Sequence, residues 1–341
     1  MNINTNELQL KSSSGSDPSC TSVLLSSGTF TGTCTESWAN LKPLILPTQS
    51  DVGYAWVARK FDKDFGSSKD AQNKMDDKPV PVVMGPVSSS SASVGLYMYD
   101  HHHTLAALDY SGYDDTTVTV IVSCDWRSQS NATFWANMDA NYVYSLTRDQ
   151  NNLSALPVPM ASPQADLPSS FAFTSSSSTF GDDPYRSLAS FVRKVQNSSC
   201  TDDESKYCER GYDRVCNAEG GGIPFFEFMW AYYTNSVVLA SNNGDNAWWP
   251  SSEDAAAFNQ AWDALAPSSV SKLSSVDVDA WDDAATLLVP LCRGTPTGTY
   301  KLPADANFAY SALPGYVQGW EALPGDPDCA LAACSKATSE V

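Results

Sequence analysis

A chain of 341 residues with 42% hydrophobic and 11% aromatic residues can bury one large core or two smaller ones, which excludes wholesale disorder. Its formal net charge of -19 repels phosphate backbones at long range, so a broad nucleic-acid-binding surface and a polymeric nucleic-acid substrate are disfavoured. A local basic pocket could still admit a phosphate. No apolar run is long enough to span a bilayer, so we expect no membrane partner.

Nine cysteines are many for a cytosolic enzyme, and none of them has the paired CxxC spacing of a zinc site. Disulfides formed in an oxidising compartment explain them better, and an extracellular or secretory location is predicted. Because Met1–Asn4 does not resemble a signal peptide, this prediction requires a leader that was removed; a cytoplasmic protein with free thiols is the alternative. The odd count leaves one thiol without an internal partner, and Cys124, inside an apolar strand pattern, is the candidate. Glycosylation sequons that agree with secretion begin at Asn131, Asn152 and Asn197.

The first part of the chain predicts an α+β core behind a short polar segment. Residues 1–36 are rich in Ser and Thr and form a tail, or a lead-in stapled by Cys20 and Cys34. Residues 37–150 are expected to form the core. Its predicted elements are strands at 41–47, 80–84, 94–99 and 116–123, helices at 52–65 and from residue 104, a serine loop at 88–93 and a helix at 134–141.

The second part of the chain predicts mainly helices. Residues 151–265 form a helical extension that contains a cysteine-rich insert at 197–222. Residues 266–341 are rich in turn-forming residues and predict a loose C-terminal extension with late cysteines. Helices are predicted at 184–195, which an Asp-Asp-Pro start signal precedes, at 224–233 and at 255–265.

All three histidines of the chain are consecutive, and they lie between a predicted strand and a predicted helix. His101, His102 and His103 follow Asp100 and precede Thr104. A helix N-terminus attracts phosphate or carboxylate, and imidazoles there can donate hydrogen bonds or transfer protons. We therefore expect a functional cluster, although one ring could instead be a packed core histidine. Neighbouring side chains point in different directions, so neither a metal site nor a cofactor is predicted.

The chain resembles the ParB-like nuclease family, which carries an Asp-x-His-His motif between a strand and a helix. The resemblance spans roughly residues 40 to 235 and leaves both ends of the chain outside it. The segments that carry it, in chain order, are 47–54 (PTQSDVGY), 80–85 (VPVVMG), 96–108 (LYMYDHHHTLAAL), 134–138 (FWANM), 182–189 (DDPYRSLA) and 225–231 (FFEFMWA).

The resemblance implies a ParB/sulfiredoxin-like core with a small mixed sheet and a phosphate-facing pocket at the junction of strand, histidines and helix. The complete expected fold adds a helical extension and disulfide-stapled termini to this core. The sequence departs from the wider superfamily in two ways. Thr104 stands where ParB-like motifs often place Arg after the His pair, and the motif contains no cysteine for sulfiredoxin-type reduction.

Four further residues are candidates for ligand binding, each with a structural alternative. Arg186 could clamp an anion, or form an ion pair with Asp182, Asp183 or Glu227. Gln49 could bind a ligand or cap the next helix, and Lys60 could bind a ligand or be a solvated helix residue. Glu227, among aromatic residues, could pair with Arg186 or act as an acid or base with a raised pKa.

The sequence therefore predicts a hydrolase of the ParB-like nuclease type that acts on a phosphoester. His102 and His103 would act as general acid and base or as the phosphate-facing nucleophile, and Asp100 would orient them. His101, Thr104, Arg186, Gln49, Lys60 and Glu227 would bind the ligand. Two alternatives stay open: a lyase, isomerase or phosphotransferase for a small anionic metabolite, and a secreted module that binds an anionic ligand without catalysis.

Overall fold

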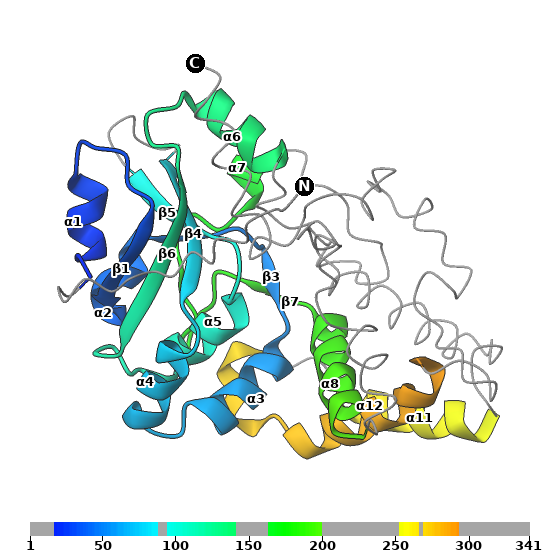
Figure 1. Cartoon of the computed structure of the whole chain (residues 1–341). Helices are drawn as coiled ribbons and strands as arrows, with labels where there is room; N and C mark the ends of the chain where they lie inside the picture. The colour runs from blue at the N-terminus through cyan, green and yellow to red at the C-terminus, as the bar shows by residue number, and fades with distance from the viewer. Residues whose placement is uncertain (1–16, 88–93, 141–162, 200–251, 266–268, 293–341) are drawn as a thin grey trace, which may run out of the picture.

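A five-stranded mixed sheet organises the computed structural model, which describes residues 17–87, 94–140, 163–199, 252–265 and 269–292 (Figure 1). The neighbours β1–β6 and β4–β5 pair antiparallel, whereas β4–β6 and β5–β2 pair parallel. The α+β class expected from the sequence is thereby confirmed. In sheet order the strands are β1 (Gly32–Ser37), β6 (Thr117–Asp125), β4 (Val80–Pro86), β5 (Val94–Met98) and β2 (Ile45–Pro47).

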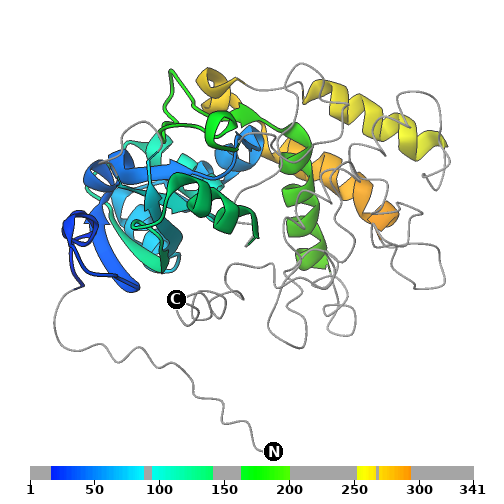
Figure 2. The same cartoon turned by 90° about the horizontal axis from the view of Figure 1, so that it is seen from above.

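Helices cover both faces of this sheet. On one face, α3 (Tyr54–Asp64), α4 (Ser68–Asp76) and α5 (His102–Ser111) bury the alternating valines of β6 (Figures 1 and 2). On the other face, α6 (Asn131–Ala140) packs Phe134 against Tyr97 and Trp126. Gly85 allows that close approach, since an added Cβ would lie 2.1 Å from the Phe134 ring.

A second group of helices packs on α3, away from the sheet (Figure 1). It contains α8 (Pro184–Ser199), α11 (Ser252–Ala264), the 3-10 helix η2 (Val270–Ser275) and α12 (Val278–Cys292). Phe191 of α8 stacks on Trp281 of α12 with ring centroids 5.5 Å apart. The prediction of a loose segment from residue 266 onward is therefore wrong for 270–292, where apolar residues at helical spacing supply part of this second core.

The predicted elements agree with the observed ones except at a few positions. The strand predicted at 41–47 exists only from Ile45, because α2 (Trp38–Leu41) and the 3-10 helix η1 (Lys42–Leu44) precede it. The serine loop, most of the cysteine-rich insert and the helix predicted at 224–233 lie outside the described residues. Short elements complete the set: α1 (Cys20–Leu25), β3 (Asp51–Val52), α7 (Pro163–Asp166) and β7 (Gly181–Asp182). No helix in the described ranges is long and apolar enough to cross a bilayer.

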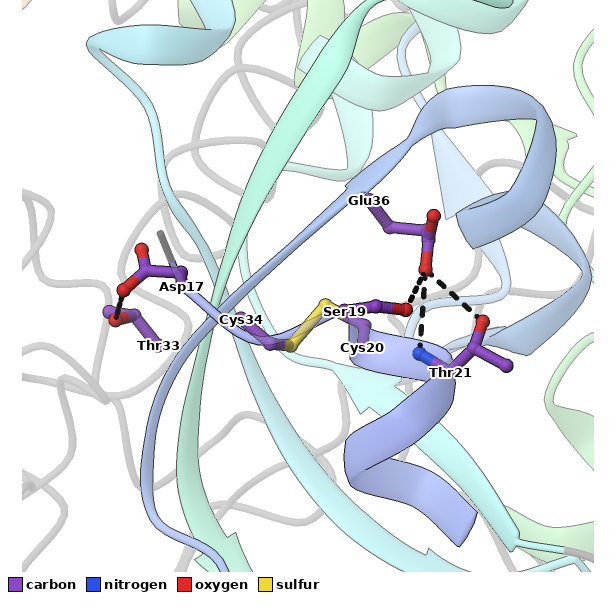
Figure 3. The surroundings of a disulfide bond; sticks show 7 residues. All are labelled: Asp17, Ser19, Cys20, Thr21, Thr33, Cys34 and Glu36. Carbon is purple, nitrogen blue, oxygen red and sulfur yellow. Dashed lines mark hydrogen bonds between the residues drawn. A yellow bond between two sulfur atoms is a disulfide. The ribbon is translucent and has the colours of Figure 1, made fainter. Parts of the chain in front are cut away.

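The end of the segment expected to be a tail or lead-in belongs to the sheet, because β1 (Gly32–Ser37) forms its edge strand. A Cys20–Cys34 disulfide ties α1 to β1, as Figure 3 shows, and one oxygen of Glu36 accepts hydrogen bonds from Ser19 and Thr21. The Arg127 guanidinium adds a second anchor: it donates to Asp125 and to the carbonyl oxygens of Val23, Leu24, Ser26 and Gly28.

Cys124, near the end of β6, is also disulfide-bonded. The prediction that it is a buried free thiol is therefore wrong. The apolar strand pattern identified its burial correctly but carried no information about a partner distant in sequence.

We expect the Cys20→Ala/Cys34→Ala double variant to unfold with a free energy about 3 kcal/mol below that of the wild type. The bridge joins residues 14 positions apart. Such a cross-link lowers the conformational entropy of the unfolded chain, which stabilises the folded protein by about 3 kcal/mol for a loop of this length. Urea unfolding in the absence of reductant measures the change. A loss below about 1 kcal/mol would show that the hydrogen bonds of Glu36 and Arg127 hold this segment without the bridge.

Candidate functional site

The histidine cluster lies at one end of the sheet, where β2 and β5 end and β4 begins. Pro47 pairs with Met98, and the Tyr99 N–H donates to the Pro81 carbonyl. The chain then turns sharply into α5. His101, the residue before this helix, has a φ of 68°, and within the described ranges it is the one non-glycine residue with a positive φ. Strain of this kind at a non-glycine residue is typical of functional sites.

The rings of His102 and His103 accept hydrogen bonds from the backbone. The Thr48 N–H donates to Nε2 of His102 at 3.1 Å, and the Gly53 N–H donates to Nε2 of His103 at 3.0 Å. Since a backbone N–H can only donate, each neutral ring carries its proton on Nδ1. The two imidazoles thus clamp the segment 48–53 onto the start of α5.

Both rings are neutral at physiological pH. Burial, reinforced by the nearby Arg186 guanidinium, lowers the pKa of His102 to about 3. The same two causes, with Lys60 as a third, hold the pKa of His103 well below its usual value. In both rings Nε2 already accepts a hydrogen bond, and the protonated form is disfavoured. This geometry therefore favours a role in holding the backbone and in donating hydrogen bonds from Nδ1 over the proton transfer expected from the sequence.

Arg186 fixes the same segment from α8. It is 2% exposed, and its guanidinium donates to the Asp51 carbonyl at 2.6 Å and to Oε1 of Gln49 at 3.1 Å. Because a guanidinium has no acceptor, it orients the Gln49 amide with Nε2 turned away from it. Both of these contacts are internal to the protein, one to a carbonyl oxygen and one to a side-chain amide.

Gln49, Lys60 and His102 each carry a donor without an acceptor among the described residues. Nε2 of Gln49 has none, and neither does the ammonium of Lys60. Nδ1 of His102 is fully buried and likewise makes no hydrogen bond. Gln49 is 7% exposed and His102 is 1% exposed, and an unsatisfied polar atom as deep as Nδ1 of His102 is uncommon in a protein.

Lys60 is a cation placed close to the histidine cluster. Its charge acts on His103 and on Asp100, and its ammonium lies 5.9 Å from the centre of the Trp56 ring. Burial lowers the pKa of Lys60 to about 8, with a contribution from the charge of Lys74. An anion bound beside it would offset this cost.

Asp100 and His101 are the more accessible members of the cluster. Oδ1 of Asp100 accepts the His101 N–H at 2.6 Å, and Oδ2 lies 3.8 Å from Nδ1 of the His101 ring. Their side chains are 32% and 16% exposed. Thr104 is buried one turn into α5, where its N–H donates to the His101 carbonyl, and Glu227 lies outside the described residues.

Asp182 is a neighbour of the site that the sequence suggested only as part of a helix-start signal and as an ion-pair partner for Arg186. Its Oδ1 accepts a hydrogen bond from the Tyr54 N–H at 2.8 Å. The preceding residue, Gly53, donates its N–H to His103. Burial raises the pKa of Asp182 to about 8. The Asp-Asp-Pro segment predicted a helix start, and Asp183 does cap α8, but no local pattern showed that Asp182 caps α3 instead.

No group of three or more His, Cys, Asp or Glu side chains is placed to hold a metal ion in the part of the chain that the structure describes. Gly53 is the last residue of the clamped segment, and an added Cβ there would meet Ser187 Oγ at 2.4 Å. α8 and the 48–53 segment are therefore packed in direct contact.

Comparisons with known proteins place the chain in a family. The family described as "Putative ParB-like nuclease" matches residues 40–236, which include the junction and the segment that carries Arg186. A crystal structure of protein Atu1540 from Agrobacterium tumefaciens is similar at 20% identity and a TM-score of 0.44, covering 84% of this chain and 97% of that chain. Comparison with curated proteins gave no match. The chain thus belongs to the family of ParB-like nucleases.

Proposed function

We propose that the chain is a hydrolase that cleaves a phosphoester at the start of α5. The observation that carries the proposal is the set of donors on Gln49, Lys60 and His102 that lack an acceptor among the described residues. All three belong to residues around one helix N-terminus, whose partial positive charge favours an anion. Phosphate oxygens are acceptors that such donors would satisfy.

In this proposal the donors bind the phosphoryl oxygens and stabilise the charge that develops on them during attack by water. His101 removes a proton from the attacking water and returns it to the leaving oxygen, and Asp100 orients the imidazole. His102 and His103 keep the 48–53 segment in place, and Arg186 orients the Gln49 amide. Thr104, buried in α5, stabilises the turn instead of binding the ligand.

A non-catalytic anion-binding module is the second candidate. The neutral, hydrogen-bonded rings of His102 and His103 favour it, because two of the three histidines are thereby removed from proton transfer. The same donors would bind the anion in both cases. The two functions differ only in turnover, which depends on His101.

We expect His101→Asn to lower the rate of phosphoester hydrolysis by a factor of about 10² to 10⁴, the usual range for loss of a general acid–base group. Asn tolerates a positive φ, so the turn at this position is preserved. Lys60→Met is expected to raise KM, and Lys63→Met is the matched control, because Lys63 is an exposed residue of the same helix that pairs with Asp62. The measurement is release of p-nitrophenol from nitrophenyl phosphates.

Hydrolysis unchanged in His101→Asn would contradict the catalytic assignment. If phosphate binding then still depended on Lys60, the binding module would be the remaining function. Equal effects of Lys60→Met and Lys63→Met would contradict a site at the start of α5.

We also propose an oxidising compartment for the protein. The disulfides at Cys20–Cys34 and at Cys124 support it, as does the exposed sequon residue Asn131 at the first position of α6. Alkylation of the purified protein, unfolded in urea without reductant, should leave Cys20, Cys34 and Cys124 unmodified. Quantitative labelling of these thiols would contradict the proposal.

A further inference from the structure

We infer that the site takes a terminal phosphate, as on a phosphate monoester, and not the internal phosphodiester of a polynucleotide. The inference rests on the proposed function and names its substrate class. It follows from the depth of two of the donors and from the charge around them.

The donors lie too deep for a continuous backbone. Gln49 is 7% exposed and His102 is 1% exposed, and the Nδ1 atom of His102 is fully buried. A phosphorus atom must come within roughly 4 Å of such donors for its oxygens to accept at ordinary hydrogen-bond distances. An internal phosphodiester would have to carry chain below the surface on both sides, whereas a terminal phosphate enters with only one substituent.

The charge of a monoester also suits the site. A monoester close to neutral pH carries between about 1.5 and 2 negative charges. The ammonium of Lys60 forms no ion pair within the described ranges, and its contact there is with the face of the Trp56 ring, 5.9 Å away.

The charges around Lys60 suit one small anion. The groups that act on it are Lys74, Lys78, Asp64 and Asp100, and Lys74 is paired with Asp64 at 2.9 Å. Lys78 therefore adds one cation and Asp100 one anion. A protein that binds a nucleic-acid backbone makes on the order of six to ten phosphate contacts, and a chain of net charge -19 opposes such an interface.

The test compares p-nitrophenyl phosphate, bis(p-nitrophenyl) phosphate and a single-stranded oligonucleotide with hydroxyl groups at both ends. We expect the monoester to be hydrolysed at least about tenfold faster than either diester, in kcat/KM. Inorganic phosphate should inhibit competitively and raise the Tm of the wild type and of Lys63→Met, and it should do neither for Lys60→Met.

Hydrolysis of the diester or the oligonucleotide as fast as the monoester, with the same dependence on Lys60, would overturn the substrate class and leave the proposed hydrolase standing. Phosphate binding that depends on Lys60, without hydrolysis of any substrate, would overturn the hydrolase and support a site for terminal phosphate. No hydrolysis and no effect of phosphate on Tm would overturn both.

Discussion

The free energy of unfolding is expected to be greatest near pH 6.5 and to fall on both sides. Below this pH the unfolded chain binds protons at two histidines that the folded protein keeps neutral. The pKa of His102 falls from 6.5 to about 3 on folding, and that of His103 is also lowered well below 6.5. Stability contributed by these rings is therefore complete above pH 6.5 and is lost as the pH falls.

Asp182 acts in the opposite sense, because its pKa rises from 3.8 to about 8 on folding. The folded protein holds a proton there that the unfolded chain releases, so this carboxyl loses stability as the pH rises from 3.8 to 8. Between pH 4.5 and 6.5 the unfolded chain binds two protons at the histidines, whereas the folded protein binds one at Asp182. The unfolded chain therefore binds one proton more. The expected net slope is about 1.4 kcal/mol per pH unit upward to pH 6.5, followed by a similar slope downward to pH 8.

Urea unfolding at pH 4.5, 5.5, 6.5 and 7.5 measures this profile. Asp182→Asn should flatten the profile above pH 6.5 and steepen it below, whereas the matched variant Asp115→Asn, at an exposed position, should leave it unchanged. His103→Gln keeps an acceptor for the Gly53 N–H. It should lower the slope of the free energy of unfolding below pH 6.5 by the contribution of one proton. A stability independent of pH from 4.5 to 7.5 would contradict the burial of these groups as neutral species.

The second large effect is expected at Asp109, near the end of α5. This buried carboxylate accepts the Trp38 indole N–H at 3.0 Å, the Lys42 ammonium at 2.8 Å and the Phe173 N–H at 2.7 Å. It thereby joins α2, η1 and the segment before β7 to the core. We expect Asp109→Ala to lower the free energy of unfolding by about 3–5 kcal/mol, because two buried donors and one ammonium lose their acceptor.

Urea unfolding of Asp109→Ala beside Asp115→Ala provides the comparison. Asp115 lies on the surface a few residues further along, and its replacement should change the stability by no more than about 0.5 kcal/mol. Asp109→Asn keeps an acceptor and should cost less than Asp109→Ala. A loss below about 1 kcal/mol for Asp109→Ala would show that water replaces the carboxylate at this position.

Local sequence patterns identified much of the fold and pointed to a candidate site. The alternation of valines in β6, the apolar spacing of α3 and the proline-led start of α8 all depend on neighbouring residues, so a sequence carries them directly. The same holds for the histidine cluster, because strand, turn and helix follow one another there along the chain. Resemblance to a family then supplied the expected chemistry, and the family assignment is confirmed.

The sequence by itself thus determined most of the elements, the family and the location of the candidate site, whereas the tertiary structure decided which hydrogen-bond partners its side chains have. Only the fold shows that Nε2 of His102 faces the Thr48 N–H, that Arg186 orients Gln49, and that Asp182 caps a helix 128 positions away. The physical reason is that buried polar groups take whatever partner the topology brings within hydrogen-bond distance. The pKa values of these histidines and of Asp182 follow from burial among those partners, which no local pattern encodes.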